Sequence, residues 1–121
     1  MAALGCAVLI TACRKPGGSP EIGVEQQIAP WPPRVGTATV TLRISGPGDK
    51  TIGGAHVTLE GDMSHPGMRP EFGQAKEVAP GRYQGRLVFS MAGDWVILIH
   101  ITLPGGRTLE RQMDVKGVRA N

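Results

Sequence analysis

Hydrophobic and polar residues alternate with a period of two along much of the chain. In residues 37–45, Val40, Leu42 and Ile44 alternate with polar neighbours, so that one face of an extended segment is apolar and the other is polar. This alternation is typical of β-strands that are buried on one face. The same pattern returns further along the chain at Val57, Leu59, Tyr83, Leu87 and Phe89.

The last third of the chain adds a central strand and a final strand. Residues 95–103 are nearly all apolar, which predicts a strand buried on both faces. A turn at residues 104–107 leads into the last strand, where Leu109, Met113 and Val115 close the core. Glycine and proline recur too often for a sustained helix. We therefore predict an all-β fold, an immunoglobulin-like antiparallel β-sandwich of about seven strands.

The first residues of the chain resemble a bacterial lipoprotein signal. A short apolar run from Leu4 to Ile10 leads directly into Ile10-Thr-Ala-Cys13, an aliphatic residue and two small residues before a cysteine. The apolar run is too short to span a bilayer. We expect residues 1–12 to be a signal peptide and Cys13 to be the lipidated residue; the alternative is an ordinary signal peptide with a chance cysteine.

This signal predicts the location of the protein and the division of the chain. Residues 13–35 are rich in proline, glycine and polar groups and are expected to be a lipidated tether, while residues 36–118 are expected to form the folded domain. Such a lipoprotein faces the periplasm of the bacterial cell envelope. Because Arg14, and not an aspartate, follows the lipidated cysteine, the outer membrane is expected rather than the inner one.

The same processing leaves the domain without a thiol, because Cys6 leaves with the signal and Cys13 carries the lipid. A soft metal site must then use methionine and histidine. The segment Met63-Ser-His65-Pro-Gly-Met68 supplies two thioethers and an imidazole in a loop broken by proline and glycine. Such ligands favour copper, especially Cu(I), over magnesium or calcium. The alternative is a hydrophobic plug, with both methionines packed under a turn and His65 exposed.

Three further side chains bear on a metal site. Met91 follows Phe89 by two residues, so strand register predicts an inward position, where it either caps the core or projects into a site made by adjoining loops. His100 lies in the middle of a strand and is expected to be a hydrogen-bonded structural residue. His56 opens a strand on its polar face and is expected to be solvated.

Catalysis and nucleic-acid binding find no support in the sequence. Ser64 and Ser90 belong to no recognisable Ser-His-Asp arrangement. Gly53-Gly54 precedes a predicted strand, whereas a phosphate-binding loop precedes a helix. We therefore expect that the protein is not an enzyme. Aromatic residues make up only 4% of the chain, so platforms for base stacking are scarce. The formal net charge of +3 suits a protein that lies near anionic lipid head groups.

Three segments together resemble the YtkA-like domains and the related FixH-like proteins. They are the loop from Met63 to Met68, the turn Pro80-Gly-Arg-Tyr83-Gln-Gly85, and the strand end Phe89-Ser-Met91-Ala-Gly-Asp-Trp95. These families are small envelope domains with an immunoglobulin-like sandwich, found beside copper handling, heavy-metal efflux or cytochrome oxidase assembly. The resemblance covers residues 36–115. It implies a Cu(I) site at Met63, His65, Met68 and Met91, while the single loop histidine disfavours Cu(II).

Two hypotheses of different classes follow from the sequence. In the first, the protein is an envelope lipoprotein that binds copper, as Cu(I), and acts as a chaperone or buffer in metal homeostasis or oxidase assembly. Its partner would be a metal-efflux or oxidase-assembly membrane protein. In the second, the sandwich binds no metal and docks on such a membrane partner through an adaptable methionine patch. A purely structural role is a third possibility.

Overall fold

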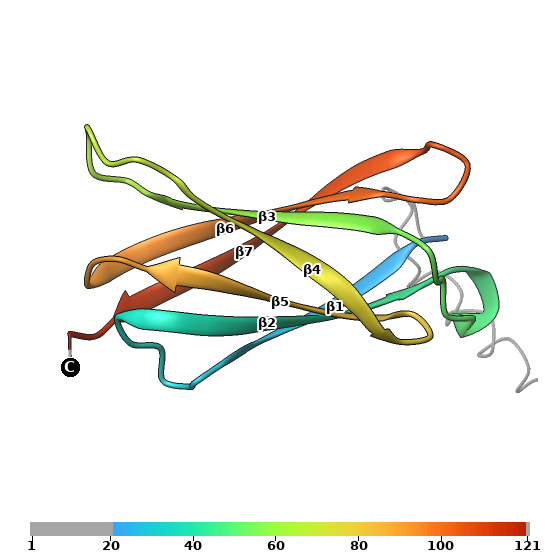
Figure 1. Ribbon diagram of the computed structural model, residues 1–121, viewed down its shortest axis with the longest axis horizontal. Helices are drawn as coiled ribbons and strands as arrows, with labels where there is room; N and C mark the ends of the chain where they lie inside the picture. The colour runs from blue at the N-terminus through green and yellow to red at the C-terminus, as the bar shows by residue number, and fades with distance from the viewer. Residues whose placement is uncertain (1–20, 121) are drawn as a thin grey trace, which may run out of the picture.

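The structure, a computed structural model, describes residues 21–120 (Figure 1). This part of the chain consists of seven β-strands and one short 3-10 helix. The bounds are β1 Gly23–Ala29, β2 Gly36–Ser45, η1 Pro47–Asp49, β3 His56–Met63, β4 Glu71–Ala79, β5 Arg82–Phe89, β6 Gly93–Thr102 and β7 Thr108–Val118. No helix in residues 21–120 is long and apolar enough to cross a membrane.

All neighbouring strands are antiparallel, in the order β1-β2-β5-β4-β3-β6-β7. Figure 1 shows β2 and β5 in one layer and β3 and β6 in the other, with β4 crossing diagonally between them. β4 pairs with β3 through residues 71–75 and with β5 through residues 75–79. This is the strand order of the immunoglobulin fold. The predicted all-β sandwich of about seven strands is therefore confirmed.

The core lies between the two layers and follows the alternation read from the sequence. Residues at every second position of β2, β5 and β6 are buried, and the positions between them face outward. The largest fully buried side chains are Trp95, Tyr83 and Phe89. In β6, however, Val96, Leu98 and His100 are half-buried, because no further layer covers that face. The prediction that this strand is buried on both faces is wrong.

Two glycines allow β4 to cross so close to β5. A Cβ atom at Gly85 would lie 2.8 Å from the Ala75 Cα, and one at Gly73 would collide with the carbonyl of Arg86. Any larger residue would push the two backbones apart. Glycine at these positions thus permits the crossing that joins the two layers.

Tyr83 and Glu77 fasten the connection between β2 and β3 to the sandwich. The Tyr83 hydroxyl donates to the Ile52 carbonyl (2.8 Å) and accepts from the Ala55 N–H (3.0 Å). Burial raises the pKa of Tyr83, so that this hydroxyl remains protonated.

The Glu77 carboxylate accepts from the N–H groups of Gly54 and Gly81, and these bonds lower its pKa. This end of the molecule is held by hydrogen bonds to backbone groups.

The structure corrects the sequence interpretation of the segment before residue 36. Residues 23–29, predicted as part of a tether, form β1, which pairs with β2 from Gly23 opposite Ser45 to Ala29 opposite Thr39. Val24 and Ile28 pack against the core, while the polar residues between them, Glu25, Gln26 and Gln27, give the segment its polar composition. The proposed signal peptide and Cys13 lie outside the described residues.

Replacing Tyr83 by phenylalanine tests the hydrogen-bonded end of the sandwich. Tyr83→Phe leaves a part-buried carbonyl and a part-buried N–H without their partner, so the free energy of unfolding should fall by about 1–3 kcal/mol. Urea unfolding followed by circular dichroism measures it. Gln84→Ala, which removes a solvent-exposed hydrogen bond from the same strand, should change stability by less than about 0.5 kcal/mol. Equal effects of the two substitutions would contradict this view of Tyr83.

Candidate functional site

Trp95 organises the end of the sandwich at which β3 and β5 finish. Its side chain is buried, with 1% exposure, and its ring lies 5.2 Å from that of Phe89 in a tilted arrangement. The indole Nε1–H donates a 3.0 Å hydrogen bond to the Met91 carbonyl. Across the sheet, Trp95 is paired with Met63. Trp95 therefore connects the two chain segments that carry Met63 and Met91, the first through its backbone and the second through its ring.

Met63 is the last residue of β3 and lies partly in the core. Its side chain is half-buried and packs against the hydrophobic cluster. The Met63 methyl group lies over Gly93, where an added Cβ atom would come within 2.8 Å of it. Gly93 also has a φ of +131°, a backbone conformation that residues other than glycine rarely adopt. Gly93 is thus required both for the turn into β6 and for the position of Met63.

Met91 lies outside the strands, and the prediction of an inward position is wrong. β5 ends at Phe89, and the backbone turns before β6 begins at Gly93. The alternation of the strand no longer applies beyond its end, and Met91 is 43% exposed. Of the two roles considered for it, capping the core and projecting into a site, the exposure favours the second. Its carbonyl accepts the hydrogen bond from the Trp95 indole.

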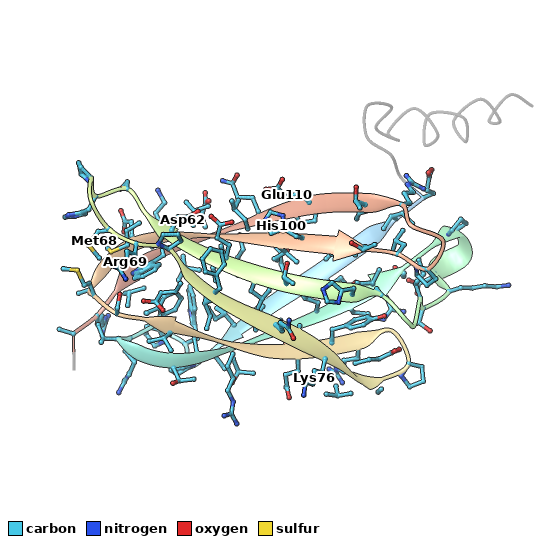
Figure 2. The ribbon with its side chains drawn as sticks, turned by 45° about the horizontal axis from the view of Figure 1, so that its top comes forward. Asp62, Met68, Arg69, Lys76, His100 and Glu110 are labelled. Carbon is cyan, nitrogen blue, oxygen red and sulfur yellow. The ribbon has the colours of Figure 1, made fainter. Side chains whose placement is uncertain are left out.

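His65 and Met68 share one turn in the connection between β3 and β4. The Met68 N–H donates to the His65 carbonyl over 3.3 Å, and Gly67 between them has a φ of +82°. The His65 side chain is exposed and Met68 is half-buried. Figure 2 labels Met68 and Arg69 at this end of the molecule.

We define the methionine end as Met63 with the connections 64–70 and 90–92. Figure 1 shows both connections at the same end of the sandwich, opposite the turn between β4 and β5. The structure places the Met63 side chain against Gly93 and ties the Met91 carbonyl to Trp95, and it places His65 and Met68 on a separate turn. A hollow of about 280 Å³ adjoins this end and includes Ser64, Asp94 and Trp95 in its lining.

The other two histidines lie away from this end. His56 is exposed, as expected. His100 lies on the outer face with its Nε2 3.4 Å from the Glu60 carboxylate, which fits the structural role expected of it. Burial and the neighbouring Glu60 raise the pKa of Asp62 on the same face. This outer-face cluster was not predicted, because only the pairing of β3 with β6 brings Glu60 to His100.

The donor atoms available at the methionine end determine which kinds of metal ion they could bind. Residues 21–120 contain no group of three or more His, Cys, Asp or Glu side chains that could hold a metal ion. The methionine end instead offers three thioethers and one imidazole. These ligands match Cu(I), whereas zinc sites use thiolate, imidazole and carboxylate ligands.

The fold and this end define the class of protein: a small immunoglobulin-like domain with three methionines and one histidine at one end. The profile of the YtkA-like family matches residues 23–100, and the chain belongs to that family. The match begins at Gly23, the first residue of β1, so the family profile includes β1 as part of the domain. No curated protein matches the chain at a significant level.

Trp95→Phe tests whether the indole holds the methionine end together. The substitution removes a hydrogen bond and opens a cavity in the core, so we expect a loss of at least about 2 kcal/mol in the free energy of unfolding. Amide hydrogen exchange of residues 91–93 should accelerate as well. The control is Trp31→Phe, at a tryptophan that is 68% exposed, with an expected change below about 0.5 kcal/mol. Unchanged exchange in Trp95→Phe would show that the loop is fixed by other contacts.

Proposed function

We propose that the protein binds Cu(I) at the methionine end and serves as a copper chaperone or buffer of the cell envelope. The residues that would hold the ion are Met63, His65, Met68 and Met91. The observation that carries the proposal is the placement of both methionine-bearing connections at one end of the sandwich, with Met91 43% exposed. Membership of the YtkA-like family supports it.

The donor set suits a protein that takes up and releases copper. Thioethers are soft, neutral ligands and carry no proton, so acid does not displace them, whereas an imidazole binds metal only when it is neutral. Met63 is held by the core and Gly93, while Met91 and His65 are exposed. A fixed ligand beside exposed ones would offer an incoming ion a partial site that the exposed side chains complete.

The location and the partner form part of the same proposal. Lipidation at Cys13 would place the domain on the periplasmic side of the envelope, with the outer membrane as its expected site. A metal-efflux or oxidase-assembly membrane protein would be the recipient or donor of the ion. Copper in this scheme is cargo, and no catalytic step is assigned to the domain.

Competition with a Cu(I) chelator tests the proposal on the mature chain, residues 13–121, with Cys13→Ser so that no thiol competes. We expect a dissociation constant below about 1 µM. Because Leu preserves the volume of Met but removes the sulfur, Met63→Leu with Met68→Leu should weaken binding by about tenfold or more. Met91→Leu and His65→Ala should each weaken it as well.

Met113→Leu is the matched control. Met113 is half-buried in β7, where it pairs with Ile97 of β6 and lies outside the methionine end, so its replacement should leave the affinity unchanged. Binding weaker than micromolar, or equal binding by the Met63/Met68 double variant and the Met113 variant, would overturn the proposal. The methionine end would then be an apolar contact surface for a protein partner.

A further inference from the structure

The sandwich has two outer faces of opposite charge. On the layer of β2 and β5, the register places Arg43 opposite Arg82 and Thr39 opposite Arg86. On the adjoining part of β4, Lys76 lies opposite Gln84 of β5. We call this surface the basic face and define it by its four cations. They are Arg43, Lys76, Arg82 and Arg86.

The other outer face is acidic. Its carboxylates come from β3 and β7, with Lys116 as a basic exception near the end of β7. Figure 2 shows Lys76 on the opposite side of the molecule from His100 and Glu110. The charges are therefore segregated by face although the whole chain has a net charge of only +3. The acidic residues on this face are Glu60, Asp62, Glu110 and Asp114.

The cations of the basic face are poorly neutralised within the molecule. In the part of the chain that the structure describes, Lys76, Arg82 and Arg86 make no salt bridge. Arg43 pairs with the exposed Asp49 at 3.2 Å, and Glu25 lies opposite it on β1. Like charges directly opposite each other in a sheet, as Arg43 and Arg82 are, repel. An anionic surface against this face would remove that repulsion.

The shape of the face fits an extended surface better than a single ligand. A small hollow of about 80 Å³ lies between β1, β2 and β5, and its lining includes Arg43 and Arg82 together with the acidic Glu25. The remaining outward residues of β2 are threonines, which can hydrogen-bond to phosphate oxygens. Guanidinium groups bind phosphates with two parallel hydrogen bonds. The outward positions of β2 and β5 hold no aromatic residue, so nucleic-acid bases would find no stacking platform.

We propose that the basic face is a docking surface for an anionic phospholipid bilayer. With Cys13 as the proposed anchor, the eight residue steps to Glu21 span at most roughly 28 Å, so the domain would stay near the membrane. Docking by this face leaves the acidic face open and directs the methionine end along the bilayer plane, accessible to a membrane-bound partner. The proposal does not depend on copper binding.

Sedimentation with lipid vesicles tests the proposal without copper. The mature chain with Cys13→Ser, which has no lipid anchor, is mixed with phosphatidylcholine vesicles that contain or lack phosphatidylglycerol. We expect binding only to the anionic vesicles, weakening as salt is raised. Each arginine near the surface contributes about fivefold in affinity, so Arg82→Gln with Arg86→Gln should weaken binding by more than about tenfold.

The matched control removes the same charge elsewhere. Lys116→Gln with Arg69→Gln gives the same net charge but leaves the basic face intact, and its binding should change by less than about threefold. Equal losses in the two double variants, or equal binding to neutral vesicles, would overturn the proposal. Tighter binding to a DNA duplex than to anionic vesicles would also overturn it. Thermal unfolding of all variants confirms that the exposed substitutions leave the fold intact.

Discussion

The buried indole of Trp95 is the constraint on which the methionine end depends. It packs on Phe89 and donates from Nε1 to the Met91 carbonyl, and the backbone of Trp95 pairs with that of Met63 in the neighbouring strand. Gly61 makes room for it, because a Cβ atom there would press on both Leu87 and the indole. A residue of the core thus fixes the backbone of the loop, while the Met91 side chain stays outside, 43% exposed. The same residue, Trp95, therefore contributes to the core and fixes the backbone beside an exposed methionine.

The opposite end of the sandwich is built on a different principle. There Tyr83 and Glu77 form hydrogen bonds with backbone N–H and carbonyl groups of the connecting loops. At the methionine end, a single backbone hydrogen bond closes the turn from His65 to Met68. An adaptable end on a fixed sandwich is consistent with our proposal that copper is carried as cargo.

Sequence reasoning succeeded where local alternation determines the structure and failed where distant contacts do. The period of two in residues 37–45 and 82–89 predicted β2, β5 and their buried faces. β1 was missed because Val24 and Ile28 are isolated apolar residues, and only pairing with β2 buries them. The predicted inward position of Met91 was wrong because β5 ends at Phe89 and the chain turns before β6 begins at Gly93. The basic face emerged only from the register between strands.

The central claim is that sulfur atoms of the methionine end bind Cu(I), and X-ray absorption at the copper edge tests it most directly. Spectra of the cysteine-free mature chain loaded with Cu(I) should show two or more sulfur neighbours at about 2.3 Å, a distance typical of metal–sulfur bonds. A shorter nitrogen contact should accompany them and disappear in His65→Ala. A spectrum with only nitrogen and oxygen neighbours, or one unchanged in the Met63→Leu/Met68→Leu variant, would contradict the account.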